Sequence, residues 1–395
     1  MERVHSGILA RDPPERAKSI GAGNKTVGFL DWILGRRTDD RVIPHTNRVR
    51  RSEQPHSDAG STSAVATLER PAKAVADSAS QSESSENWWA PEGVTQTELP
   101  AIARPELTPE AIALENTLVS HFDGHDLSIP PLPRTAEKVL ERLRDPGVNL
   151  PKIAEDIAED QVLAAAVLRL VNSPMYRGLS HIASLPLAIA RLGTNIVRTM
   201  MVQQSVRASL FDKQIGNRAL AEVVWRRSLG SACIMRSLSR FTKVDQEDAF
   251  LVGLLHDIGN VMVLRIMHAQ QMVMHDSLDV ATFEYLCHET HQEFGELIAD
   301  AWGLPEALKA LIAKHHTYPE SDDPLRLQRL QLIASDSIAA MLGYAPTAQL
   351  NLLGSRAILE LGLADPDNPN GGSPSFLEYL RELPDMLAEA TDIGA

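Results

Sequence analysis

The sequence contains few cysteines and few aromatic residues. Only Cys233 and Cys287 are present among 395 residues, and Phe, Trp and Tyr together make up 5%. Two thiols cannot form a disulfide framework or a thiolate zinc site, so we expect a reducing compartment and a cytoplasmic protein. A core with so few aromatic rings must be built from Ala, Leu, Ile, Val and Met, which favours packed helices over a β-sandwich.

Long hydrophobic runs and a basic excess are also missing. No stretch approaches the roughly 18 uncharged apolar residues that would span a bilayer, and early acidic residues and prolines are not typical of a signal peptide. The net charge of −14 is uneven, because residues 1–70 hold 12 Lys and Arg against 9 Asp and Glu, whereas the rest hold 26 against 43. Such an acidic chain repels a phosphate backbone, so we do not expect nucleic-acid binding.

The first 110 residues show no sustained helical or strand period. Breakers and Ser-rich stretches keep their apolar content too low to offset the entropy of ordering, which predicts a mostly disordered N-terminal arm. Residues 26–37 are an exception, because their apolar residues fall at helical spacing and could form a short amphipathic helix that docks on a partner, on the core or on a membrane surface. The pair Trp88-Trp89 is either a docking anchor or a pair without a role.

From about residue 111 the pattern changes to amphipathic segments separated by short loops, which predicts an all-α fold. Asn149 before Leu150-Pro151 is typical of a helix N-cap. Residues 185–192 and 194–210 predict two helices joined at Gly193. A nucleic-acid-binding regulator that uses residues 184–207 as a helix-turn-helix stays as an alternative, although the apolar residues of its second helix suit a core. Residues 355–395 predict an acidic tail with a short helix.

A His-Asp dipeptide lies in a strongly apolar stretch. His256 and Asp257 follow Leu254-Leu255, and Gly253 and Gly259 stand close by. Adjacent residues on a helix point about 100° apart, so these side chains suit an ion lodged between helices better than contact with each other. A carboxylate in such surroundings needs a cation or a set of hydrogen bonds. The two glycines allow close contact between helices.

Further residues of metal-ligand type follow on successive predicted helices: His291, His315, His316 and Asp336. An isolated histidine is usually a surface or core residue, but several such groups on successive helices favour a metal site. The alternative without a metal is that His256 and Asp257 hydrogen-bond to their neighbours and hold the helices in register.

Together these motifs resemble the HD superfamily of metal-dependent phosphohydrolases, and its HDOD branch most closely. The resemblance is carried by the following segments: Pro131-Leu132-Pro133, Ala188 to Gly193, Trp225-Arg226-Arg227-Ser228, Leu254 to Gly259, Trp302 to Pro305, His315-His316 and Asp336. It implies a multi-helix HD-like bundle at about residues 115–350. It also implies a bacterial signal-transduction module, without demonstrated hydrolase activity, that acts through contacts with signalling proteins in the setting of nucleotide second messengers.

The resemblance implies a ligand set for a divalent Fe, Mn or Zn ion. His256 and Asp257 match the defining dyad, and Asp336 matches the last ligand. His291, His315 and His316 match the additional histidines of HD phosphodiesterases that hold more than one metal.

Departures from the pattern point away from catalysis. Ser228 stands at the first ligand position, and a hydroxyl is a poor replacement for imidazole. Asn260 stands where a lysine often faces substrate phosphate, and Thr317-Tyr318 replaces the triplet typical of cyclic-di-GMP hydrolysis. We therefore predict a degenerate metal site in a non-catalytic module, with a metal-dependent nucleotide phosphohydrolase as the alternative.

Overall fold

The computed structural model describes residues 87–123, 129–145, 147–172, 176, 181–271, 278–346, 348–365, 367–368 and 371–393. Within these ranges the elements are α-helices, one short 3-10 helix and one isolated β-bridge between Ala364 and Gly372. The elements are α4 (Pro109–Asp123), α5 (Arg134–Arg142), α6 (Leu150–Ala158), α7 (Gln161–Val171), α8 (Leu185–Leu192), α9 (Thr194–Leu210), α10 (Arg218–Leu238), α11 (Gln246–Leu255), α12 (Asn260–Ala269), α13 (Val280–Ala301), α14 (Glu306–Ala313), α15 (Arg326–Leu342), η2 (Leu352–Gly354), α16 (Arg356–Glu360) and α17 (Pro374–Ile393). The prediction of an all-α bundle is confirmed. Residues 26–37 lie outside the described residues.

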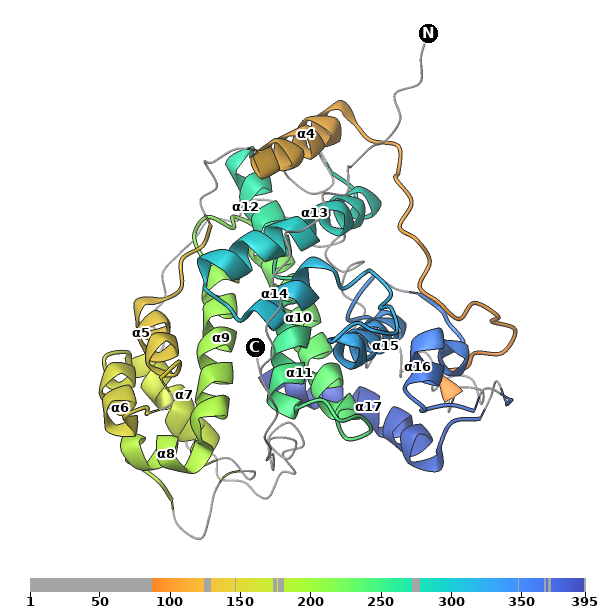
Figure 1. Ribbon diagram of the computed structural model, residues 1–395. Helices are drawn as coiled ribbons and strands as arrows, with labels where there is room; N and C mark the ends of the chain where they lie inside the picture. The colour runs from red at the N-terminus through yellow and green to blue at the C-terminus, as the bar shows by residue number, and fades with distance from the viewer. Residues whose placement is uncertain are drawn as a thin grey trace, which may run out of the picture.

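The helices form two groups that meet at α9 and α10 (Figure 1). Helices α5 to α8 pack against one another and against α9 on one side of the molecule. On the other side α10 pairs with α11, and α15 and α17 pack against α10. Helix α4 lies across α12 and α13. Helix α10 is buried along most of its length and is the central element of the core.

Several helices begin at a polar residue whose side chain accepts a hydrogen bond from a backbone N–H of the first turn: Asn149, Asp160, Asn217, Asp245 and Asp279. Such caps satisfy donors that have no partner within the helix. The predicted cap at Asn149 and the predicted helices 185–192 and 194–210 are confirmed. Gly193 joins the last two with a φ of 83°, which favours glycine.

Helix α9 belongs to the core. Val197, Met200, Met201 and Val202 are buried, and the helix contacts α5, α7 and α8 on one side and α10 and α11 on the other. Arg198 pairs with Asp248 of α11 at 3.0 Å. A recognition helix must present its side chains to a groove of DNA, whereas these apolar side chains hold the two groups of helices together.

A buried ion pair links α9, α10 and α11. Arg236 Nη2 donates to Glu247 Oε1 at 2.6 Å, and Thr199 Oγ1 donates to the other carboxylate oxygen at 3.0 Å. The guanidinium also lies over the Phe250 ring, 4.3 Å from its centroid. Because both charges are buried, loss of either partner would leave an uncompensated charge in the core.

Two glycines allow the close helix contacts that the sequence predicts. A Cβ atom on Gly253 would lie 2.6 Å from the backbone oxygen of Ser231 in α10, and one on Gly259 would lie 2.0 Å from the backbone oxygen of His291 in α13. Helix α11 is therefore pressed against α10, and the turn between α11 and α12 is pressed against α13.

The segments at the two ends of the described chain pack together. Trp89 is buried, and its carbonyl accepts a hydrogen bond from Leu352 N at 2.8 Å. Trp88 Nε1 donates to the carbonyl of Leu380 in α17 at 3.0 Å. The mostly disordered arm predicted for residues 1–110 therefore needs correction over residues 87–110, because the indoles anchor this segment on the C-terminal residues.

The C-terminal residues also differ from the predicted tail with a short helix. Helix α17 spans Pro374–Ile393 and buries Phe376, Tyr379 and Leu383. The Tyr379 hydroxyl and Ser237 Oγ of α10 lie 2.8 Å apart. This helix is part of the core.

The stretch Gln246–Ala269, which contains α11, α12 and the turn between them, is long and apolar enough to cross a membrane by composition alone. However, 89% of its most apolar window is buried inside the fold. Such burial is typical of the core helices of a globular domain.

We expect Gly259→Ala to lower the free energy of unfolding by about 1 to 3 kcal/mol, the usual cost of forcing an extra methyl group into a packed contact. Gly147→Ala is the matched control, because a Cβ at that exposed position would lie 3.4 Å from the nearest side-chain atom. It should change stability by no more than about 0.5 kcal/mol. Urea unfolding of the full chain measures both, and equal midpoints would contradict the packing argument.

Candidate metal centre

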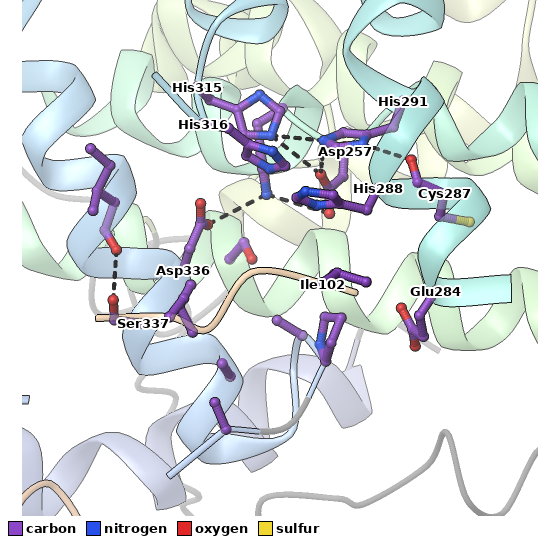
Figure 2. A pocket seen from close by; sticks show the side chains of 18 of the residues that line it. Ile102, Asp257, Glu284, Cys287, His288, His291, His315, His316, Asp336 and Ser337 are labelled. Carbon is purple, nitrogen blue, oxygen red and sulfur yellow. Dashed lines mark hydrogen bonds and ion pairs between the residues drawn. The ribbon is translucent and has the colours of Figure 1, made fainter. Parts of the chain in front are cut away.

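The candidate ligands come from four places in the fold (Figure 2). His256 and Asp257 lie in the turn between α11 and α12, and Asp336 lies on α15. His291 lies on α13, and His315 follows the end of α14. The prediction that the His-Asp pair lies within a helix is wrong, because the helix ends there at the turn that Gly259 lets pack against α13.

Asp257 lies at the centre of the cluster. Its Oδ1 lies 3.4 Å from His291 Nε2 and 3.6 Å from His315 Nε2, and its Oδ2 lies 3.5 Å from His256 Nε2. His256 Nε2 is also 3.5 Å from Asp336 Oδ1. Three imidazoles from three places in the fold therefore surround the Asp257 carboxylate, and Asp336 lies beside one of them, His256.

The backbone fixes how the three histidines face the cluster. Each Nδ1 lies at hydrogen-bonding distance from a backbone carbonyl three or four residues earlier: His256 from Gly253 at 2.9 Å, His291 from Cys287 at 2.7 Å and His315 from Ile312 at 2.8 Å. A carbonyl only accepts, so Nδ1 carries the proton in each ring. In a neutral ring Nε2 then presents a lone pair to the cluster, as in metal-binding histidines.

Two of these nitrogen atoms face each other. His291 Nε2 and His315 Nε2 are 3.0 Å apart. Burial lowers the pKa of His315 to about 4, so this ring is neutral near pH 7. Two lone pairs at such a distance repel each other unless a proton or a metal ion lies between them.

The two carboxylates of the cluster differ in how readily they ionise. Burial would raise the pKa of Asp257, but His256 and the other nearby histidines lower it well below its ordinary value. Burial raises the pKa of Asp336 to about 7, and the neighbouring Asp257 adds to this. Burial acts to lower the pKa of His256, but the two carboxylates outweigh it and raise this pKa. Asp257 therefore ionises beside the histidines, and a bound cation would favour the ionised form of Asp336 as well.

A second group overlaps the first. His291, His315 and His316 offer ligand atoms within 4.8 Å of one another, as do His256, Asp257 and His315. His288, which is not among the predicted ligands, stacks its ring on that of His316 with centroids 4.5 Å apart. Its position three residues before His291 places it on the same face of α13 and could have revealed it.

The donor atoms fit a transition metal. Ligands bound to one ion at about 2.1 Å lie roughly 3.0 to 3.5 Å apart, and the nitrogen and oxygen separations in the cluster are similar. Imidazole with carboxylate suits Fe, Mn or Zn better than Ca or Mg, which prefer oxygen alone. All six predicted residues lie in or beside this cluster, which could bind a metal ion.

Ser228, predicted to stand at the first ligand position, lies apart from the cavity. Ser228 is buried in α10 and does not line the cavity beside the cluster, whereas Arg227 and Ser231 do. Arg227 Nη1 pairs with Glu284 Oε1 of α13 at 2.8 Å. A guanidinium cannot donate a lone pair to a metal. Arg227 and Ser231 are therefore the residues of α10 that line the cavity, and neither offers an imidazole.

The cavity has a volume of about 610 Å³, within the range of small-molecule sites. It is bounded by the cluster, by α10, α13 and α15, by residues 98–102 and by the turn after α15. Its charged side chains outside the cluster are Glu98, Glu284 and Arg227. The cavity could hold a small ligand next to a bound metal.

Comparison with known proteins agrees with this arrangement. The family model of the HDOD domain matches residues 129–318. A solved structure from Shewanella amazonensis, provisionally named a metal-dependent phosphohydrolase, is similar with a TM-score of 0.55 and 19% identity over 71% of this chain and 100% of its own. An HDOD domain protein of unknown function from Geobacter sulfurreducens is similar with a TM-score of 0.51 and 20% identity, over 72% of this chain and 98% of its own.

A curated relative, an uncharacterized protein of Treponema pallidum, is 23% identical over 259 residues, which cover 62% of this chain. The chain spans about half of that relative, 48% of its length. At these identities the solved structures show the fold alone, and the family model assigns the domain. Residues 129–318 of the chain therefore match the HDOD domain.

Proposed function

We propose that this chain is a non-catalytic signalling module whose HDOD domain binds a divalent metal ion and passes on its state through protein contacts. One observation carries the metal site: three imidazoles, each held by a backbone carbonyl at Nδ1, direct Nε2 toward Asp257. Orientation of ligands by such second contacts is typical of metal sites.

The non-catalytic part of the proposal rests on what surrounds the cluster. Asn260 offers a neutral amide where a lysine would neutralise substrate phosphate. The charge of Arg227 is shared with Glu284 at 2.8 Å. Hydrolysis of a phosphate ester requires stabilisation of developing negative charge, and these residues supply little of it.

The signalling part follows from the family, whose members resemble output modules of bacteria. We propose that the input reaches this module from a separate signalling protein, in a nucleotide second-messenger pathway and in the cytoplasm. A metal-dependent phosphohydrolase is the second candidate, because the cavity beside the cluster could admit a substrate and the similar Shewanella structure is named for that activity.

We expect the metal-stripped chain to bind Mn²⁺, Fe²⁺ or Zn²⁺ and to melt at a higher temperature when one of them is added. At a free metal concentration 100 times Kd the stabilisation would be about 2.7 kcal/mol. Asp257→Asn should weaken binding at least about tenfold, because it removes the carboxylate common to the three imidazoles. Calorimetric titration and melting curves with and without chelator measure this.

Asp322→Asn is the matched control, since Asp322 is exposed and does not line the cavity. Its metal affinity should equal that of the wild type. Equal stabilisation of wild type and Asp257→Asn by metal would reject the site.

We expect the metal-loaded chain to hydrolyse bis(p-nitrophenyl) phosphate, p-nitrophenyl phosphate and cyclic dinucleotides no faster than Asp257→Asn does. The physical reason is the lack of a cation positioned for substrate phosphate. Release of p-nitrophenol and chromatography of the nucleotides provide the rates. Turnover by the wild type about tenfold or more above Asp257→Asn would establish the phosphohydrolase instead.

A further inference from the structure

Five consecutive residues outside the matched domain cover the cavity. Residues 98–102, here called the strap, all line it, together with His256, Asp257 and Asp336. The strap has no helical or strand structure. Figure 2 shows the segment that bears Ile102 crossing the view between Asp336 and Glu284. The strap therefore forms one side of the cavity that the candidate metal centre also lines.

The strap is anchored before and after its central residues. Upstream, Asn351 N donates to Gln96 O at 2.7 Å, and Arg356 N donates to Glu98 Oε1 at 2.7 Å. Downstream, Arg104 pairs with Glu115 of α4 at 2.6 Å. The anchors connect the strap to α16 on one side and to α4 on the other.

The central residues are held differently. Among the described residues, no hydrogen bond joins residues 99–103 to the rest of the fold. Ile102 packs against the core, and Leu99 is 39% exposed. Segments with few buried contacts and no backbone hydrogen bonds open locally at low cost while the rest of the fold stays closed.

We propose that the strap is a hinged cover of the cavity, and that its contacts with the residues around α16 set how often the cavity opens. Displacement of residues 98–102 would admit solutes to the wall formed by Asp336 and α13. This proposal rests on the proposed function in one respect: the strap would control access to the metal site. The opening of the strap itself requires no metal. A partner that moves the N-terminal segment or α16 would change access to the site.

Cys287 provides a probe of opening that requires no metal. It lines the cavity and is 7% exposed, and the chain has one other cysteine, Cys233. In the full chain with Cys233→Ser, labelling of Cys287 by a maleimide reports access to the cavity. We expect Glu98→Ala with Ile102→Ala to raise the labelling rate about fivefold or more, because the closed state loses one hydrogen bond and one apolar contact. The milder Ile102→Ala alone should give a smaller rise.

Two controls separate the strap from general loosening. Glu106 follows the strap, is exposed and does not line the cavity. Glu106→Ala should therefore leave the labelling rate of Cys287 unchanged. In a Cys287→Ser background the buried Cys233, which does not line the cavity, reports opening of the core. An unchanged rate at Cys287, or an equal rise at Cys233, would overturn the proposal.

Metal release gives a readout that distinguishes this proposal from the proposed function. Extraction of Co²⁺ by EDTA should be faster in the strap variants than in the wild type. If no metal binds, the proposed metal site fails while the labelling rates still decide the strap. If metal binds but labelling and extraction rates match the wild type, the strap proposal fails and the metal site stands.

Discussion

The close approach of the α11–α12 turn to α13 is the constraint on which the candidate site depends. A side chain at Gly259 would collide with the backbone oxygen of His291, so only glycine lets the two segments touch. This contact places the Asp257 carboxylate between His256 of its own turn and two histidines of other elements. A packing constraint that involves no polar side chain therefore determines the position of the polar cluster.

Charge balance differs between the two buried polar clusters of the fold. Arg236 and Glu247 match one positive with one negative charge, and Thr199 satisfies a second carboxylate oxygen. Around Asp257 two carboxylates meet histidines, two of whose Nε2 atoms lie 3.0 Å apart, a contact that requires a proton or a metal ion between them. A cluster that only held helices in register would require every partner to be satisfied. The metal interpretation therefore explains this geometry better than the structural one.

Local patterns in the sequence predicted much of this fold, because helix periods, N-caps and glycine contacts depend on nearby residues. They also indicated the six candidate ligands, which share residue types suited to one ion. The break of the helix at residues 256–259 was missed because it arises from contact with α13. Arg227 rather than Ser228 lines the cavity because of the orientation of α10 about its own axis, since adjacent residues on a helix point about 100° apart. A local pattern does not show that orientation. The role of Trp89 depends on residues more than 250 positions away, which no local pattern shows.

The candidate site is not contained in the matched domain. The family model covers residues 129–318, whereas Asp336 follows that range and the strap precedes it. Asp336 reaches the cluster because α15 packs against α10 and α11, whereas the strap is held by the C-terminal extension, where Trp89 O accepts from Leu352 N and Glu98 accepts from Arg356 N. The ligand set and its cover are therefore completed by residues that the family model does not include. Any change in how the extensions pack would act directly on the site, which gives this module a physical route from a contact at its ends to its centre.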